Sequence, residues 1–154
     1  MKRPGGAAAA LVGCLAVTAC GGHTATKQDV VARANGICIN TLRAARSVPP
    51  PAGGAGSPAA LAAYLQKVVP IVEKEASDTR ALPRPAQDRA VLDRYVAAVS
   101  ADASQYRALA RAAKNDDLAA ISHGLAALRA SQVPALAARY GLTRCSASAG
   151  SGVS

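Results

Sequence analysis

Apolar residues recur along the chain at alternating spacings of three and four, which is the period of an amphipathic helix. The first predicted helix covers residues 27–46, and Asp29 near its start favours the positive end of the helix dipole. A Pro-rich and Gly-rich loop at residues 48–56 ends it. Its apolar stripe consists of Val30, Ala34, Ile37 and Thr41.

The second predicted helix begins at Ser57–Pro58, an N-cap residue followed by proline at the first helical position. Pro70 lies inside the helix and is expected to kink it, because proline has no backbone N–H to donate. The segment 82–85, which holds two prolines, makes the next break. The stripe of the second helix consists of Leu61, Leu65, Val68 and Val72.

Two further helices follow, over residues 86–114 and from residue 118 to Tyr140. The acidic turn 115–117 separates them, a second kink is predicted at Pro134, and Gly141 is expected as a left-handed C-cap. The third stripe consists of Leu92, Tyr95, Val99, Tyr106, Leu109 and Ala113. The fourth consists of Leu118, Ile121, Leu125, Leu128 and Leu136.

Four amphipathic helices with two short connections and one longer one predict an all-α fold, an antiparallel four-helix bundle. The composition supports this fold, because the chain has no Phe, no Trp and one Met, and its core must pack Leu, Val and Ala. Helical repeats are the alternative, but no self-similar period runs along the chain.

The start of the chain has the pattern of a secretory signal peptide. Lys2 and Arg3 precede an uncharged apolar stretch over residues 5–17, too short for a bilayer span of roughly twenty residues. The segment 17–20, Val-Thr-Ala-Cys, resembles the lipobox of bacterial lipoproteins. Cys14 also ends a lipobox-like sequence, but cleavage there would leave an unusually short hydrophobic region.

The lipobox resemblance implies a signal peptide at 1–19 and a diacylglyceryl group on Cys20. A lipidated tether at 20–26, a helical domain at 27–145 and a disordered tail at 146–154 would follow. We therefore expect a lipid anchor that holds the protein on the extracytoplasmic face of the cell membrane. Loss of Lys2 and Arg3 with the leader would lower the net charge from +9 to +7.

The other two cysteines, Cys38 and Cys145, are predicted to form a disulfide, because the leader sends them to a disulfide-permissive compartment. In an up-down-up-down bundle the end of the fourth helix lies near the start of the first, so residues 142–144 could run back along the first helix to Cys38. A redox pair is the alternative, although the spacing is unlike Cys-x-x-Cys.

Groups for catalysis or cofactor binding are scarce. His123 is the one histidine of the predicted domain, and with Asp116 or Asp117 it makes the best metal constellation the sequence offers. The chain lacks a haem motif, a nucleophile elbow and a phosphate-binding loop. We therefore expect no cofactor, no bound metal and no catalytic residue.

The acidic residues Glu73, Glu75 and Asp78 are expected on a solvated surface rather than in a site. Their spacing does not place them on one helix face, and Lys74 is positioned to pair with Asp78 four residues later. The four tyrosines, at positions 64, 95, 106 and 140, are interpreted as packing residues.

A basic stripe on the third helix consists of Arg107, Arg111 and Lys114. On a lipid-anchored domain such a stripe could contact an anionic lipid or wall polymer. The alternative is an ordinary solvated face. Nucleic acid is not expected as a partner, because the predicted address is extracytoplasmic and no stacking aromatics accompany the basic residues.

The lipobox, the Ala-rich helices and the ending Ala-Arg-Tyr-Gly-Leu-Thr-Arg-Cys at 138–145 together resemble small actinobacterial lipoproteins of unknown function. The resemblance implies an envelope location and a helical fold, and it transfers no catalytic residue. The leading hypothesis is a non-enzymatic anchored domain that binds a partner at the cell surface. The alternatives are a carrier of a small apolar ligand between helices kinked at Pro70 and Pro134, and an enzyme that uses His123.

Overall fold

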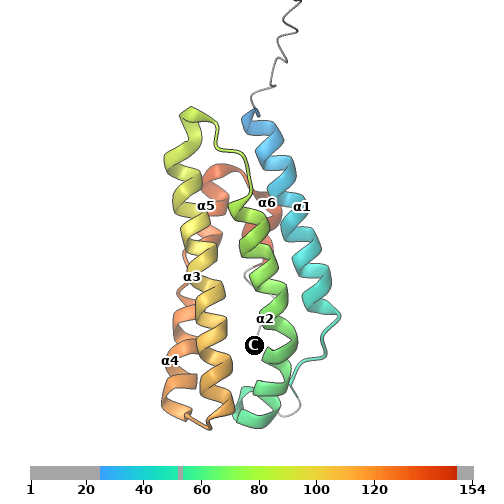
Figure 1. Cartoon of the computed structure of the whole chain (residues 1–154), viewed down its shortest axis with the longest axis vertical. Coiled ribbons are helices and arrows are strands. Elements are labelled where there is room, and N and C mark those ends of the chain that lie inside the picture. The colour runs from blue at the N-terminus through green and yellow to red at the C-terminus, as the bar shows by residue number, and fades with distance from the viewer. Residues whose placement is uncertain (1–24, 52–53, 149–154) are drawn as a thin grey trace, which may run out of the picture.

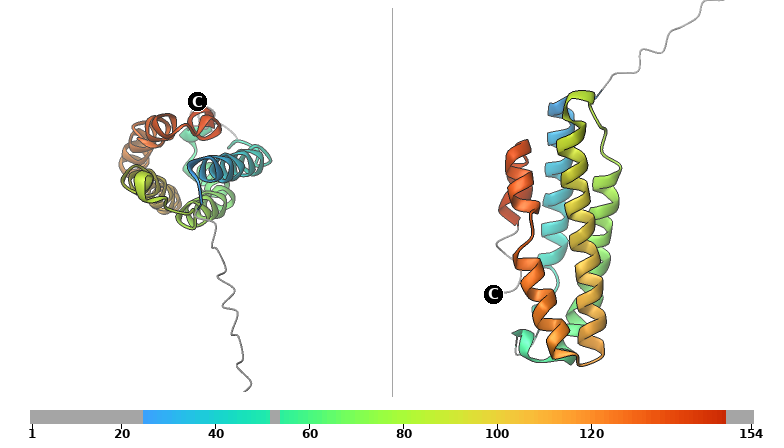
Figure 2. Two further views of the ribbon diagram at one scale, coloured as in Figure 1. Left: turned by 90° about the horizontal axis from the view of Figure 1, so that it is seen from above. Right: turned by 90° about the vertical axis from the view of Figure 1, so that its left-hand side faces the viewer.

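A computed structural model describes residues 25–51 and 54–148, and these residues form an all-helical antiparallel bundle without strands. The long helices α1 (Lys27–Arg46), α2 (Pro58–Arg80) and α3 (Arg89–Lys114) run down, up and down (Figure 1). The ascending fourth position is filled by α4 (Leu118–Arg129) and α5 (Val133–Tyr140). Seen from above, the helices surround a common centre (Figure 2). The predicted fold class is confirmed.

Local signals in the sequence set where α1 and α2 begin. Thr26 and Asp29 form a capping box at α1, in which Thr26 Oγ1 accepts the Asp29 N–H at 3.2 Å and Asp29 Oδ2 accepts the Thr26 N–H at 2.9 Å. Ser57 Oγ accepts the Ala60 N–H at 3.3 Å at the start of α2. α2 continues past Pro70 to Arg80. The predicted bounds of the first helix are confirmed at both ends.

Short 3₁₀ helices flank two of the long helices. η1 (Gly54–Gly56) precedes α2, and η2 (Ala86–Asp88) precedes α3. The first three residues of the predicted third helix therefore adopt a tighter turn, and the α-helix proper begins at Arg89.

The predicted fourth helix is not continuous, which corrects the expectation of one helix kinked at Pro134. The break falls at residues 130–132, and Pro134 lies in the first turn of α5, where its missing N–H costs nothing. Ser131 Oγ accepts the Val133 N–H at 3.1 Å and donates to Asp102 Oδ2 at 2.5 Å. This side chain fixes the junction between α4 and α5 to α3.

Gly141 ends α5 with φ +92°, the predicted left-handed C-cap. The chain then forms one more helix, α6 (Thr143–Ser148). Residues 146–148 therefore continue a helix, although the sequence predicted the start of a disordered tail there.

The disulfide predicted between Cys38 and Cys145 is present and joins α1 to α6. The two sulfur atoms lie 2.04 Å apart and the two Cα atoms 5.2 Å apart. Both residues are almost fully buried, and the Arg144 N–H donates to Asn35 Oδ1 at 3.0 Å beside them. The staple thus closes the bundle between its first and last described helices.

The core divides into two clusters of buried residues. The larger includes Val30, Leu92, Tyr95 and Leu142, and the smaller forms around Leu61, Leu65, Leu109 and Ile121. Leu118 was predicted to be buried but is 66% exposed. It is the first residue of α4, and this helix begins at one end of the bundle. Among the described helices, none combines the length and apolar character that a membrane span requires.

Candidate ligand-binding cavity

Two carboxyl groups occupy positions on the buried stripes of α2 and α3. The α2 stripe runs 61, 65, 68 and 72, and the next position of this pattern is Glu75. The α3 stripe runs 92, 95 and 99, and Asp102 lies midway between Val99 and Tyr106. Both residues are half-buried, and since α2 and α3 pack against each other, the two side chains lie close to the space between the helices.

A cavity of about 460 Å³ lies between the helices, and both carboxylates line it. α4 packs mainly against α3, and α1 packs against α2 and α6, which leaves a hollow between the later part of α1 and α4. Its apolar wall includes Leu42, Val48, Val68, Val72, Val99, Ala103, Leu125, Leu128 and Val133. Its polar lining includes Thr41, Arg46, Tyr64, Glu75, Asp102, Tyr106, Arg129 and Ser131.

The Glu75 carboxyl group has no charged partner among the described residues. The Cys38 sulfur lies 3.8 Å from its Oε1 atom. That sulfur belongs to the disulfide and carries no hydrogen, so it has nothing to donate to a carboxylate. Burial, and secondly the negative charge of Asp102, raises the pKa of Glu75 from 4.5 to about 7. Glu75 is therefore poised between its protonated and ionised forms near neutral pH.

Asp102, unlike Glu75, accepts a hydrogen bond from a side-chain hydroxyl group. Its Oδ2 accepts the hydrogen bond from Ser131 Oγ at 2.5 Å. Burial raises the pKa of Asp102 above its ordinary value, and the Ser131 hydrogen bond acts in the opposite direction. Asp102 thus contributes negative charge to the cavity while it also holds the α4–α5 junction in place.

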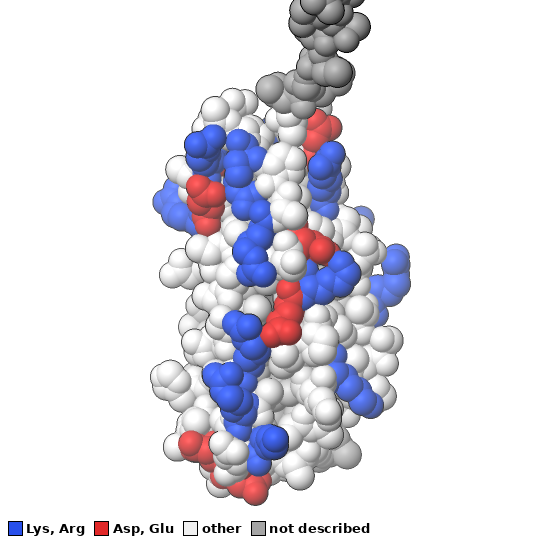
Figure 3. Space-filling model, viewed as in Figure 1, with Lys and Arg blue, Asp and Glu red and all other residues white. Residues whose placement is uncertain are grey.

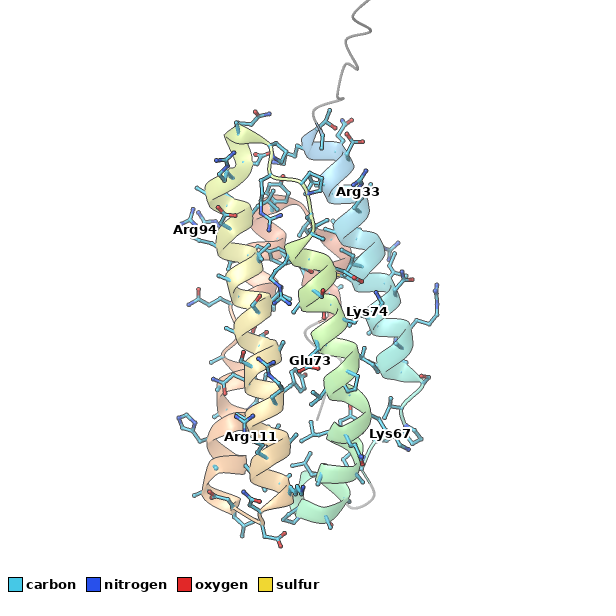
Figure 4. All side chains as sticks on the ribbon, viewed as in Figure 1. Arg33, Lys67, Glu73, Lys74, Arg94 and Arg111 are labelled. Carbon is cyan, nitrogen blue, oxygen red and sulfur yellow. A yellow bond between two sulfur atoms is a disulfide. The ribbon has the colours of Figure 1, made fainter. Side chains whose placement is uncertain are left out.

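The expectation that the acidic residues at 73–78 lie on a solvated surface is wrong for Glu75. Its neighbours do lie outside: Glu73 accepts from Arg107 at 3.3 Å, and Asp78 pairs with Lys74 at 2.7 Å as predicted. Figure 4 shows Glu73 beside the seam between α2 and α3 (Figure 4). Glu75 differs because it is the member of the group that continues the apolar spacing of α2.

The tyrosines serve mainly as packing residues, as predicted, and two of them also line the cavity. Tyr95 is fully buried in the larger cluster, and its hydroxyl lies 3.7 Å from the Cys38 sulfur. Tyr64 and Tyr106 form part of the cavity wall. Tyr140 is buried in the larger cluster and donates to Asp88 Oδ2 at 3.1 Å.

The predicted basic stripe is present and solvated. Arg107, Arg111 and Lys114 are all exposed on α3, and Arg107 is held by Glu73 and by Ser104 Oγ at 2.9 Å. Figure 3 shows Lys and Arg side chains in a run over the α2–α3 face, interrupted by Asp and Glu (Figure 3).

The other predicted positions do not gather into a site. Cys20 lies outside the described residues. His123 is exposed on α4, and Asp117 is used to cap that helix by accepting the Ala120 N–H at 2.9 Å. In the part of the chain that the structure describes, no three His, Cys, Asp or Glu side chains lie close enough to hold a metal ion.

The cavity was expected only in general terms, from the predicted kinks at Pro70 and Pro134, and its two carboxylates were not expected. Glu75 was assigned to the surface together with Glu73 and Asp78, because these acidic residues do not share one helix face, and Asp102 was not predicted as a site residue. The positions of Glu75 and Asp102 on the stripes were the available signal. No family model, no curated protein sequence and no solved structure matches this chain.

Proposed function

We propose that this chain is a non-enzymatic envelope lipoprotein whose helical domain binds a small, mainly apolar molecule in the cavity between α1, α2, α3 and α4. The observation that carries the proposal is the cavity itself. Its volume of about 460 Å³ falls within the range typical of small-molecule sites, roughly 300–1,000 Å³. Its wall combines aliphatic side chains with a few polar groups, which is also typical of such sites.

The size of the cavity suits a ligand with a short hydrocarbon body. Burial of an eight-carbon chain contributes on the order of 6 kcal/mol at about 0.8 kcal/mol per methylene, before the costs of association are subtracted. We therefore expect dissociation constants of roughly 0.1 to 1 mM or weaker for simple probes, because about 5.5 kcal/mol corresponds to 0.1 mM and association costs reduce the gross gain. A natural ligand with additional polar contacts would bind more tightly.

The lipid anchor remains part of the proposal. The leader and Cys20 support an address on the extracytoplasmic face of the membrane, where the domain could take up or deliver an envelope metabolite. The intact mass of protein recovered from membranes tests this point. A diacylglyceryl mass on Cys20 is expected, and an unmodified thiol there would contradict the anchor.

A second candidate is contact with an anionic lipid or wall polymer through the basic stripe on α3. The observation that favours it is that Arg107, Arg111 and Lys114 are all exposed on one helix. Co-sedimentation with anionic vesicles tests it, because binding should weaken with salt and with the double change Arg111→Gln, Lys114→Gln. Equal binding to neutral vesicles would contradict it.

Calorimetric titration with 1-octanol tests the cavity proposal. The full chain is used with Cys20→Ala, so that partition of octanol into an attached lipid does not contribute. Ala45 lines the cavity, and Ala45→Phe should fill part of it and weaken binding by about tenfold or more, 1.4 kcal/mol. Ala32→Phe places the same ring on the exposed face of α1 and should leave binding unchanged.

Helix content measured by circular dichroism confirms that both variants remain folded. Saturable binding that is lost in Ala45→Phe and kept in Ala32→Phe supports the proposal. An absence of saturable binding, or equal affinity in both variants, would overturn it.

A further inference from the structure

We propose that the cavity selects small organic cations, in which a protonated amine lies against Glu75 and Asp102 and an apolar body packs along the valines of α2 and α3. This inference rests on the proposed function, and it adds the chemical class of the ligand. It follows from the charge and hydrogen-bonding capacity of the cavity wall.

The first argument is charge complementarity. Two carboxyl groups from neighbouring helices line one mainly apolar cavity, and neither forms an ion pair with a Lys or Arg of the described residues. A carboxylate in such surroundings is costly unless an opposite charge accompanies it. A ligand cation would supply that charge, whereas a neutral or anionic ligand would leave the carboxylates uncompensated or repelled.

The second argument is hydrogen-bonding capacity. Among the described residues, Glu75 receives no hydrogen bond from an N–H or O–H group, and Asp102 receives one, from Ser131. Both carboxylates therefore retain free lone pairs. A primary ammonium group carries three N–H donors and no acceptor, which matches a site made of acceptors. An alcohol has one donor and would satisfy the same wall less completely.

The third argument concerns the groups that face Glu75 from the surrounding helices. Asp102 adds negative charge from α3, and the Cys38–Cys145 disulfide, which joins α1 to α6, does not titrate. The tyrosines nearby stay neutral, since burial raises the pKa of Tyr95 and Tyr106 further above neutrality. The remaining charged or titratable groups of the cavity wall are Arg46 on α1, Tyr64 on α2 and Arg129 on α4.

Arg46 and Arg129 are exposed to solvent, so screening weakens their effect on the interior. Titration near neutral pH therefore falls mainly on Glu75, whose pKa is about 7. An alkylammonium ion keeps its charge across this range, as a lysine side chain does. Affinity for a cation should then fall as the pH is lowered and Glu75 becomes protonated.

The test compares octylamine with 1-octanol, two probes with the same hydrocarbon chain, in calorimetric titrations of the full chain carrying Cys20→Ala. At about pH 8 we expect octylamine to bind at least about tenfold more tightly than octanol. At about pH 5.5 the preference should shrink to roughly threefold or less, because Glu75 is then mostly protonated. Octanol affinity should change little between the two pH values.

Glu75→Gln should reduce the preference for octylamine over octanol to roughly threefold or less at pH 8. Glu73→Gln is the matched control, because Glu73 lies two residues earlier and pairs with Arg107 outside the cavity. It should retain the full preference. Asp102→Asn provides a second variant. The pH dependence is measured on the chain with both carboxyl groups present, so this part of the test does not depend on whether a variant folds.

The outcomes separate this inference from the proposed function. Octanol binding without a preference for octylamine would overturn the cation selectivity and leave the cavity proposal standing. Binding of neither probe would overturn both. A preference for octylamine that is the same at both pH values and in Glu75→Gln would overturn the assigned role of Glu75.

Discussion

Replacement of Glu75 by glutamine should change the pH dependence of folding stability in a defined direction. The pKa of Glu75 is about 7 in the folded chain against an ordinary value of 4.5. The folded state therefore holds a proton on Glu75 at pH values where the unfolded chain has released it. Stability consequently falls as the pH rises from 4.5 to 7 and is constant, as far as this group is concerned, above and below that window.

The magnitude follows from the difference between these two pKa values. At 1.36 kcal/mol for each pKa unit, Glu75 lowers the free energy of unfolding by about 3 kcal/mol above pH 7 relative to pH 4.5. Partial access to solvent reduces this figure, so about 2–3 kcal/mol is the expected range. Glu75→Gln removes the titrating group, and the variant should gain stability relative to the unsubstituted chain as the pH is raised.

Urea unfolding followed by far-ultraviolet circular dichroism at several pH values from 4.5 to 8 measures this effect. The quantity of interest is the difference in free energy of unfolding between the variant and the unsubstituted chain at each pH. Glu73→Gln serves as the control, and its difference should vary little, since Glu73 forms a solvated pair with Arg107. A constant difference for Glu75→Gln, or one of opposite sign, would refute the account of Glu75 as a buried acid.

Two further predictions concern the scaffold. The pair Cys38→Ala, Cys145→Ala should lower the free energy of unfolding by about 4 kcal/mol, because the bridge closes a loop with a sequence separation of 107; an unchanged urea midpoint would contradict a native disulfide. Gly36→Ala should raise stability by about 0.5–1 kcal/mol, since a Cβ there meets no atom within 4 Å. Gly124→Ala should gain less stability or lose some, because its Cβ would lie 3.2 Å from Leu109 Cδ1. Equal increases in the free energy of unfolding for the two variants, measured in urea, would contradict this steric argument.

The sequence predicted the helices most accurately where local chemistry decides their ends. Both ends of α1 and the Ser57–Pro58 start of α2 were predicted because a cap or a proline acts through the nearest few residues. An interruption of the fourth helix near Pro134 was predicted correctly, but the helix breaks before Pro134 and is not merely kinked there. The hydrogen bond from Ser131 to Asp102 on another helix helps determine that the chain starts a new helix there, and sequence spacing does not reveal that contact.

The cavity was harder to predict for a related reason. Apolar stripes indicate which faces are buried, but not how fully neighbouring helices fill the space between them. Glu75 and Asp102 occupy stripe positions, and their spacing alone placed them in the interior. Glu75 was instead judged by its spacing from Glu73 and Asp78 and by the pairing of Lys74 with Asp78, which indicated a solvated surface. A carboxylate at a stripe position is therefore a useful sign of a polar group in a bundle interior.

The most direct test of the central claim is to locate a bound probe by NMR. Titration of the isotope-labelled full chain carrying Cys20→Ala with 1-octanol should shift the backbone amide signals of the cavity wall, with the largest changes around Val68, Val72 and Val99. Within residues 25–51 and 54–148, Ile39 and Leu118 are the large apolar side chains that are exposed. Saturable shifts centred on the cavity wall are the predicted result. Shifts centred on Ile39 or Leu118, with the cavity wall unaffected, would contradict a ligand site inside the bundle.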